Sequence, residues 1–318
     1  MEITIIIVNW NTREMLRNCL QSIVDSNAKD NLKIVVVDND SKDGSREMVL
    51  NEYQDAILIN SGCNLGFGKA NNLGKDHVVG DYVLYLNPDT IVLDGTLQKM
   101  KQFMSDNPDV GALGCKMIYP DGNVQPLGLQ WFPNPLTELI NLLFVTSSTI
   151  SNLNSYLPYQ DPNNSAYVNK LYGGCLLVRK SVLDRVGWFD ERFFMYGEDV
   201  DLCRRIVDAG WKLYYMSDAV IIHLCGGASS KSTSDFSTLM MCDSISKLIG
   251  KYDGVIGYIL YRLAIFAGSN VRLLILLIVK ICRLNIQDSL TADYENSINK
   301  YKAMLKWSLN LQRPTIPA

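Results

Sequence analysis

The chain has 318 residues, of which 47% are hydrophobic and 20% charged, and its formal net charge is −3. That length is sufficient for one large domain with an appended segment, and the charge gives no reason to expect nucleic acid as a partner. Eight cysteines are scattered without a C-x-x-C pair, which favours reduced, buried thiols in a cytoplasmic protein over a disulfide framework or a zinc site.

The first sixty residues predict alternating strands and helices. Residues 3–8 form a β-branched run, typical of a strand buried on both faces and too short for a signal peptide. A helix is expected at about 13–26, a strand at 33–37, a helix at 45–53 and a short strand at 56–60. This β-α-β-α-β order implies a parallel sheet with right-handed crossovers.

Polar side chains follow the first two strands where each strand ends. Asn9 and Asn11 follow the first strand, and Asp38 and Asp40 follow the second. In open α/β sheets, ligands bind at the carboxyl ends of the strands, where acidic residues suit ribose hydroxyls or base N–H groups. We therefore expect a nucleotide to bind at this edge.

The glycine pattern excludes two other nucleotide-binding folds. The first strand continues into Asn9, Trp10 and Asn11 rather than G-x-G-x-x-G, which argues against a dinucleotide-binding dehydrogenase. Residues 62–70 lack the spacing and the final Ser or Thr of a P-loop. Gly66 nevertheless permits close approach of the backbone to a ligand, although an ordinary strand-to-helix turn also fits.

A fourth strand, at residues 83–86, ends abruptly at Asn87-Pro88-Asp89. Pro88 cannot donate to a sheet ladder and restricts the residue before it, so the strand must stop here. Asp89 is thus an oxygen ligand at the carboxyl end of a strand, which suits a hard divalent cation and the phosphates it carries. A turn without any ligand is the alternative.

The middle of the chain predicts a helix at 96–106, a strand at 110–117, a hairpin-type turn at 119–122 and a strand or strand pair at 168–178. Residues 126–166 are rich in Pro, Asn and Ser and have an apolar patch at 136–145, which indicates an inserted loop region with a short helix able to contact a substrate. Ser181 is expected to cap a helix at 182–186 that stops at Gly187.

A helix predicted at 198–209 carries the most informative acid. Its inward stripe comprises Asp199, Leu202, Cys203 and Ile206. Asp201 is expected on the opposite, exposed face, where it pairs with Arg205. Stabilisation of the helix dipole accounts for Glu198 and Asp201 but not for an acid on the buried stripe. Desolvation should raise the pKa of Asp199, which makes it the candidate general base.

The last third of the chain contains a candidate ligand and a long helical region. Strands are expected at 211–216 and 219–222, and the second ends at His223. The glycine-rich loop that follows (226–230) has backbone N–H groups free to bind phosphate, which favours a ligand role for His223. A purely structural histidine is the alternative. Residues 255–283 contain no acid, and their four basic residues fall within about a quarter of a helical wheel. Uncharged runs here are shorter than the roughly 20 residues of a membrane span, so a basic helix on a membrane surface is expected, or one packed on protein.

Together these motifs resemble the family-two glycosyltransferases, inverting enzymes with a GT-A fold, and especially their bacterial rhamnosyltransferase-like branch. The resemblance covers about residues 3–235. It rests on VNWN (8–11), VDNDSKDGS (37–45), NLGFG (64–68), LNPDT (86–90), YGGC (172–175), FDERFFMYGEDVDL (189–202) and IH (222–223). It implies an α/β fold with a Rossmann-like, mostly parallel sheet flanked by helices as a catalytic domain (1–235). The segment after it (236–318) lies outside the resemblance, and its helical pattern and basic residues predict a helical extension that associates with a membrane or packs on protein.

The resemblance also implies roles for individual residues. Asn9, Asn11, Asp38, Asp40, Gly66 and Asn87 would bind the nucleotide. Asp89 and His223 would hold Mg²⁺ or Mn²⁺ on the donor diphosphate, with Asn87 replacing the first acid of the family's D-x-D motif. Asp199 would be the catalytic base, and Trp188, Asp190 and Glu191 would hold the acceptor.

The implied reaction is a single displacement that inverts the anomeric carbon, in the synthesis of bacterial surface polysaccharide. The implied donor is dTDP-L-rhamnose, and the acceptor is a saccharide or lipid-linked saccharide. A lipid-linked acceptor is expected because the basic C-terminal segment would bring the enzyme to the anionic inner face of the cell membrane. Three alternatives are a UDP-sugar transferase of the same fold, a pyrophosphorylase-like nucleotidyltransferase and a non-catalytic nucleotide-binding scaffold subunit. The absence of a basic, glycine-rich loop after the first strand argues against the nucleotidyltransferase. The oligomeric state is left open.

Overall fold

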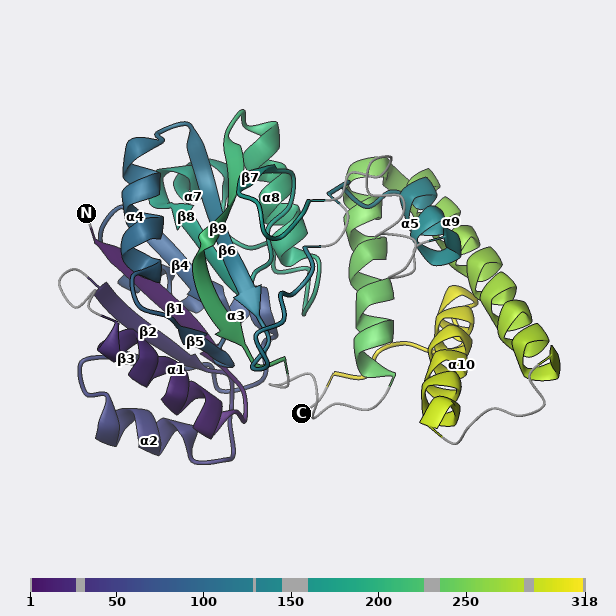
Figure 1. Cartoon of the computed structure of the whole chain (residues 1–318), viewed down its shortest axis with the longest axis horizontal. Coiled ribbons are helices and arrows are strands. Elements are labelled where there is room, and N and C mark those ends of the chain that lie inside the picture. The colour runs from purple at the N-terminus through teal and green to yellow at the C-terminus, as the bar shows by residue number, and fades with distance from the viewer. Residues whose placement is uncertain are drawn as a thin grey trace.

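The computed structural model describes residues 2–26, 32–127, 130–144, 160–225, 235–282 and 289–316. It consists of an α/β body and a helical unit that lies beside it (Figure 1). The helical unit comprises α5 (Pro135–Phe144), α9 (Phe236–Cys282) and α10 (Ser289–Ser308). The predicted phosphate-binding loop at 226–230 and the basic residue Arg283 lie outside the described residues.

The N-terminal half of the body forms the predicted parallel sheet. β1 (Ile3–Asn9), β2 (Leu32–Asp38), β3 (Ile57–Asn60) and β4 (Tyr82–Leu86) all run in one direction. The helical connections are α1 (Arg13–Asp25), α2 (Ser45–Glu52) and α3 (Phe67–Leu73), the last followed by a 3₁₀ turn at Lys75–His77. The register pairs Asn9 with Asp38 and Asp38 with Asn60, so these strands end at one common edge.

The second half of the sheet is mixed. It contains β5 (Thr90–Val92), β6 (Val110–Ile118), β7 (Ala166–Val168), β8 (Cys175–Arg179) and β9 (Lys212–His223). Within the described ranges the strand order is β3-β2-β1-β4-β8-β6-β9-β5, with β7 also paired to β9. β8 is antiparallel to both of its neighbours, whereas β6 and β9 are parallel. The sheet thus places the chain segments after β4 and β9 close together.

Helices cover both faces of the sheet, as the continuous apolar strands predict. Ile5 and Ile7 of β1 pack with α1, α2 and α4 (Thr96–Asp106) on one face. Ile6 and Val8 point to the other face and pack with α3, α7 (Lys180–Val186) and α8 (Glu198–Asp208). Because successive side chains of a strand point to opposite faces, one β-branched run supplies both halves of the core.

Three local predictions differ from the structure. The two strands expected at 211–222 are one continuous strand, β9, with an irregular register opposite β6. Helix α7 begins at Lys180, so Ser181 lies inside the helix and does not cap it. The seven described cysteines are unpaired, but Cys63 and Cys225 are exposed rather than buried.

The helical unit has its own apolar core. α9 continues through a sharp change of direction at Gly254, whose φ of 69° is outside the range of helices. Leu239, Ile265, Met304 and Trp307 bury one another where α9 packs against α10. The helix of the inserted region, α5, packs on α9 and not on the sheet. The insertion and the C-terminal helices therefore form one structural unit next to the body.

Candidate active site

The polar ends of β1 and β2 form a tight, hydrogen-bonded edge. The Asp38 carboxylate is only 1% exposed and accepts hydrogen bonds from Ser41 N (3.0 Å) and Asn9 Nδ2 (3.4 Å). Asn39, which the sequence analysis did not single out, instead faces the cavity described below. Its amide donates to Asn64 Oδ1 (2.9 Å) and accepts from Leu65 N (2.9 Å), which ties β2 to the glycine loop.

Asn11 and Asp40 shape this edge through their backbones. Both have positive φ, 54° and 69°, which Asn and Asp tolerate better than most residues. Asn11 Oδ1 accepts from Lys42 N (2.7 Å), and Asp40 forms an ion pair with the Lys42 side chain (2.7 Å). Neither Asn11 nor Asp40 lines the cavity, so the structure brings them close to the predicted site without exposing them to its interior.

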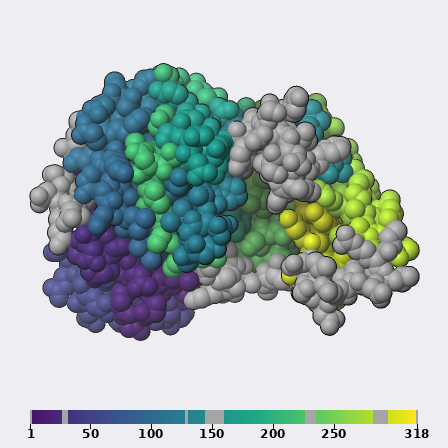
Figure 2. All heavy atoms as spheres, viewed as in Figure 1, coloured from purple at the N-terminus to yellow at the C-terminus, as the bar shows by residue number. Residues whose placement is uncertain are grey.

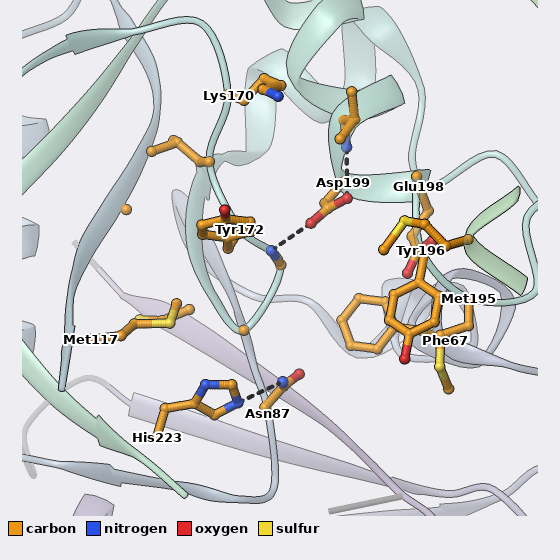
Figure 3. A pocket seen from close by; sticks show the side chains of 18 of the residues that line it. Phe67, Asn87, Met117, Lys170, Tyr172, Met195, Tyr196, Glu198, Asp199 and His223 are labelled. Atoms are coloured by element: carbon orange, nitrogen blue, oxygen red, sulfur yellow. Dashed lines mark hydrogen bonds between the residues drawn. The ribbon is translucent and has the colours of Figure 1, made fainter. Parts of the chain in front are cut away.

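A cavity of about 770 Å³ opens at the carboxyl edge of the sheet. Asn87 and His223 lie at one end of the view in Figure 3, and Asp199 lies at the other, with Tyr172 between them. The loop at 172–174 touches both ends: Gly173 N donates to Asp199 Oδ2 (3.0 Å), and Gly174 O accepts from Asn87 N (3.0 Å). Residues 26 to 136 positions apart in sequence thus meet around one space.

Asp89 and His223 lie next to each other at the sheet end of the cavity. Asp89 Oδ1 is 3.4 Å from His223 Nε2, because β5 pairs with the last residues of β9. Gln125 Oε1 lies 3.0 Å from His223 Nδ1, and Gln125 Nε2 donates to the His223 backbone oxygen. A carbonyl oxygen can only accept, so Nδ1 donates to Gln125, and Nε2 is the ring nitrogen that faces Asp89.

This pair fits a divalent cation. Cis ligands of an octahedral ion with bonds of about 2.1 Å are roughly 3 Å apart, close to the observed separation of Asp89 and His223. Among the described residues, no group of three or more His, Cys, Asp or Glu is arranged around one point. Asn87, 3.5 Å from His223 Nε2, is neutral, as the sequence predicts. A cation bound by Asp89 and His223 would therefore take its remaining ligands from water or a bound substrate.

Asp199 lies in the first turn of α8 and is partly exposed to the cavity, whereas its neighbours Glu198 and Asp201 are buried. Its two carboxylate oxygens accept from Gly173 N (3.0 Å) and Val200 N (2.8 Å), which fix the side chain toward the cavity. Burial raises the pKa of Asp199 above its ordinary value, and the backbone donors oppose this shift. The result is an oriented carboxylate of increased basicity in the cavity wall.

Glu198 is a second acid of the site that the sequence analysis assigned only to the helix dipole. It is 4% exposed, lines the cavity, and its Oε2 has no hydrogen-bond partner among the described residues. Burial, reinforced by the charge of Asp199, raises the pKa of Glu198 to about 8. Burial and the neighbouring charge thus disfavour two ionised carboxylates side by side at this position.

Two ionisable residues from distant segments complete the wall near Asp199. Glu138 reaches the cavity from α5, and burial raises its pKa to about 7. Lys170 lies in the loop after β7, and burial lowers its pKa despite the opposing charges of Glu138 and Asp199. Glu138 lies within the predicted apolar patch at 136–145 and Lys170 within the strand predicted at 168–178, and neither position carried a sequence signal for a role in the site.

Asp201 is buried, which contradicts the predicted exposed position. It is 0% exposed; its Oδ2 accepts from Arg205 Nε (2.8 Å), and its Oδ1 accepts from Lys251 Nζ (2.6 Å) and Tyr252 Oη (2.9 Å). The predicted pair with Arg205 is present. The face is covered because α9 packs there and supplies Lys251 and Tyr252, which a helical wheel of α8 alone cannot show.

The three predicted acceptor residues do not line the cavity. Asp190 forms ion pairs with Lys251 and Arg192, and Glu191 accepts from the amide of Asn72 (3.2 Å). Trp188 packs against the core on the α8 side of the sheet. The cavity positions that follow them are instead filled by Phe194, Met195 and Tyr196. This loop reaches the site through its aromatic and apolar residues, not through its acids.

Gly66 is required by the approach of that loop. Its φ is 78°, and a Cβ at this position would lie 2.1 Å from the carbonyl oxygen of Phe194, which accepts from Phe67 N at 2.7 Å. Gly62 has a nearly identical φ of 76°, but a Cβ there would meet nothing within 4 Å. Comparing the two positions therefore separates the effect of the positive φ from the effect of the close contact with Phe194.

We expect Gly66→Ala to reduce the free energy of unfolding by at least about 2 kcal/mol more than Gly62→Ala. Both changes place a Cβ at a positive φ, which costs about 1–2 kcal/mol in the left-handed region, and only Gly66→Ala adds a backbone clash. Urea denaturation followed by circular dichroism measures the difference. Equal losses in the two variants would show that the loop at 194 moves away without cost.

Comparison with solved structures defines the class of this fold. A mannosyltransferase from Pyrobaculum calidifontis, solved in complex with GDP-Man and Mn²⁺, superposes with a TM-score of 0.57 over 98% of this chain and 86% of its own, at 16% identity. Staphylococcus aureus TarS 1-349 in complex with UDP-GlcNAc gives a TM-score of 0.52 over 98% and 84% of the chains, also at 16% identity. The chain has a GT-A-like α/β fold.

Sequence comparison gives the family. Residues 4–187 match the model of Glycosyl transferase family 2, and the chain belongs to that family. An N-acetylglucosaminyl-diphospho-decaprenol L-rhamnosyltransferase of Mycobacterium tuberculosis is 33% identical over 219 residues, 60% of this chain and 66% of the relative's length. Rhamnosyltransferase WbbL of Escherichia coli is 28% identical over 227 residues, 69% of this chain and 82% of that protein.

Proposed function

We propose that this protein is an inverting glycosyltransferase that moves L-rhamnose from dTDP-rhamnose to a saccharide or lipid-linked saccharide in the synthesis of bacterial surface polysaccharide. One observation carries the proposal: a desolvated carboxylate, Asp199, shares a cavity with the Asp89–His223 pair. A transferase of this class needs a base at one end of its site and charge neutralisation for a leaving diphosphate at the other.

The donor nucleotide is proposed to bind along the carboxyl edge of β1, β2 and β4. Asn39, Gly66 and Asn87 line the cavity there, next to Asp89. Mg²⁺ or Mn²⁺ held by Asp89 and His223 would supply Lewis-acid stabilisation of the diphosphate. Asp38 would act indirectly. Its carboxylate accepts from Ser41 N and so holds the turn next to Asn39, whose side chain lines the cavity.

The acid–base chemistry is assigned to Asp199. Its carboxylate accepts the proton of an acceptor hydroxyl, and the hydroxyl oxygen forms a bond to the anomeric carbon of the donor. The bond from that carbon to the diphosphate oxygen breaks on the opposite face, and its electron pair leaves with the nucleotide diphosphate. Gly173 N and Val200 N hold the carboxylate in position, and the raised pKa of Glu198 beside it disfavours a second negative charge.

The acceptor is proposed to enter from the side of the helical unit. Glu138 and Asn141 of α5 and Met241 and Ile245 of α9 line this part of the cavity. Asn141 Oδ1 is buried without a hydrogen-bond partner among the described residues, which suits a sugar hydroxyl. The apolar α9 residues beside it suit a lipid-linked acceptor, the kind that the name of the mycobacterial relative specifies.

The proposal is tested by a donor panel with Mn²⁺ and the full chain. dTDP-rhamnose should raise the thermal unfolding temperature most and should be turned over in the presence of acceptor. Preferential turnover of UDP-GlcNAc or UDP-galactose would support the UDP-sugar alternative. Tight nucleotide binding without metal-dependent turnover of any donor would contradict the enzymatic proposal and favour a scaffold subunit.

Replacing Asp89 should lower turnover by about a hundredfold. Asp89→Ala removes the only described carboxylate beside His223 and leaves the charge on the departing diphosphate poorly neutralised. Asp94→Ala, at an exposed position outside the cavity, is the matched control and should retain full activity. Steady-state rates across a Mn²⁺ titration measure the effect, and an unchanged Mn²⁺ requirement in Asp89→Ala would remove this residue from the metal site.

A further inference from the structure

The second half of α9 presents a long apolar face to solvent. Twelve hydrophobic side chains of this half are 41–74% exposed, and they recur every three or four residues along one side of the helix. They are Val255, Ile256, Ile259, Leu260, Leu263, Phe266, Val271, Leu274, Ile275, Leu277, Ile278 and Ile281. We name these residues the outer face of α9. Isolated exposed apolar residues are common on proteins, but a continuous stripe about 40 Å long indicates contact with another apolar phase.

The opposite side of the same helix is covered by protein. Tyr261 and Ile265 are buried against α10, and Arg262 donates to the backbone oxygens of Trp307 and Ser308 at the end of α10. Arg272 donates to Leu142 O in α5. The expectation that these arginines face a membrane is therefore wrong, because both bind the C-terminal carbonyls of neighbouring helices. The side of α9 that remains free is its apolar side.

This arrangement favours a helix that lies in the membrane surface over one that crosses the membrane. By length and composition α9 could cross a membrane, since one 18-residue window carries enough hydropathy and few charges. However, α5 and α10 pack along its inner side, and α10 carries exposed Lys300, Lys302 and Lys306. A helix with polar protein along half of its circumference cannot be surrounded by lipid.

The charge distribution complements an anionic surface. Residues 255–318 contain eight basic and three acidic residues, a net charge of +5, whereas residues 1–254 carry a net charge of −8. Arg262 and Arg272 are held by backbone carbonyls, so the attraction to an anionic leaflet, about 1 kcal/mol per basic residue at the surface, comes from exposed lysines of α9 and α10: Lys280, Lys300, Lys302 and Lys306. Most of the chain would be repelled by such a leaflet, so the charge also orients the protein with its helical unit toward the membrane.

The polar content of the outer face argues against a second protein as its occupant. Among the exposed side chains of residues 255–281, all of which the structure describes, only Asn270 and Lys280 are polar. Asn270 Nδ2 already donates to Phe266 O at 2.8 Å. Specific protein interfaces carry about one hydrogen bond per 100–200 Å², and this face offers almost no donors or acceptors for them.

We propose that the outer face of α9 lies in the interfacial layer of the anionic, cytoplasmic leaflet of the cell membrane, with the helix axis parallel to the membrane plane. The first half of the same helix lines the cavity through Phe236, Met241 and Ile245. Figure 1 shows this half next to the α/β body and the second half slanting away from it, and Figure 2 shows the helical unit as a mass beside the body. The cavity wall on the acceptor side is thereby continuous with the membrane-bound helix.

Vesicle flotation with the full chain, without donor or acceptor, tests this inference separately from the proposed function. The chain should float with vesicles that contain phosphatidylglycerol and phosphatidylcholine, and it should bind less to pure phosphatidylcholine or in high salt. The combined replacement Ile259→Gln, Leu263→Gln and Leu274→Gln should reduce the bound fraction at least about tenfold, since three apolar side chains no longer enter the lipid. All three positions are exposed, and an unchanged thermal unfolding curve confirms that the variant folds.

Leu50→Gln is the control, because Leu50 is 61% exposed on α2, outside the helical unit, and its replacement should leave binding unchanged. Three results would overturn the proposal. The wild-type chain could remain at the bottom of the gradient with anionic vesicles. It could form a dimer by sedimentation velocity that the triple variant converts to a monomer, which would identify a second copy as the occupant. It could resist extraction from cell membranes with alkaline carbonate, which would identify a membrane-spanning helix.

Discussion

Asp199→Asn should reduce kcat/KM for sugar transfer by about a thousandfold, within the range for removal of a general base. The amide cannot accept the acceptor's proton, although it occupies the same volume and retains one oxygen for Gly173 N or Val200 N. The donor end of the cavity is untouched, so stabilisation of the fold by the donor nucleotide with Mn²⁺ should persist. Initial rates and thermal unfolding, measured on the same preparation, separate these two effects.

Asp208→Asn is the matched control, because Asp208 lies in the last turn of the same helix and is exposed. It should retain wild-type activity. The wild-type pH profile gives a second check: kcat/KM should fall as pH decreases through the pKa of Asp199, because the base must be ionised. Burial raises that pKa, so the fall should begin above the range of an ordinary aspartate, about 3.9. A rate for Asp199→Asn near that of the wild type would exclude this residue as the base.

Asp201→Ala should reduce the free energy of unfolding by about 3–5 kcal/mol, the range for breaking a buried ion pair from one side. Asp201 is fully buried and accepts from Arg205, Lys251 and Tyr252. Its removal leaves two cationic groups, both mostly buried, without their shared carboxylate. The contact that this network makes between α8 and α9 also holds the helical unit against the body. Urea denaturation gives the loss in stability.

The control variant is Asp208→Ala. Asp208 is 59% exposed and approaches Arg204 only to 3.7 Å, so its loss should change stability by less than about 0.5 kcal/mol. Limited proteolysis adds a structural readout: Asp201→Ala should increase cleavage between the body and α9, and Asp208→Ala should not. Similar stabilities for the two variants would mean that solvent reaches the Asp201 site in solution.

Local sequence patterns predicted the sheet and most of its polar edge. The β-branched run of β1 predicted a strand buried on both faces, and the pairing of Asn9 with Asp38 follows from parallel strands that end together. Asn87-Pro88-Asp89 ends β4 at the same edge, since proline cannot continue a ladder. The helical wheel also identified Asp199, because the spacing of Leu202 and Ile206 already defines the inward face of α8.

The same wheel contained a signal for Glu198 that the dipole explanation obscured. At 100° per residue, Glu198 lies about 40° from Leu202, at the edge of the predicted inward stripe. An acid in a first turn is usually attributed to the helix dipole, and here that explanation hid a buried side chain with an unpaired oxygen. The spacing of Glu198 and Leu202 therefore fitted a position beside the buried face as well as stabilisation of the helix dipole.

The sequence by itself determined the order of strands and helices, the family motifs and the acids at the two ends of the site. Only the tertiary structure decided which acids are buried by other segments and which face of α9 is free. Asp201 is buried because α9 covers it, and Arg262 and Arg272 face inward because α5 and α10 present carbonyl groups to them. The spacing of apolar residues and the helix propensity of a segment describe one helix at a time. These contacts instead join residues 45 to 130 positions apart, so they depend on how the helices pack.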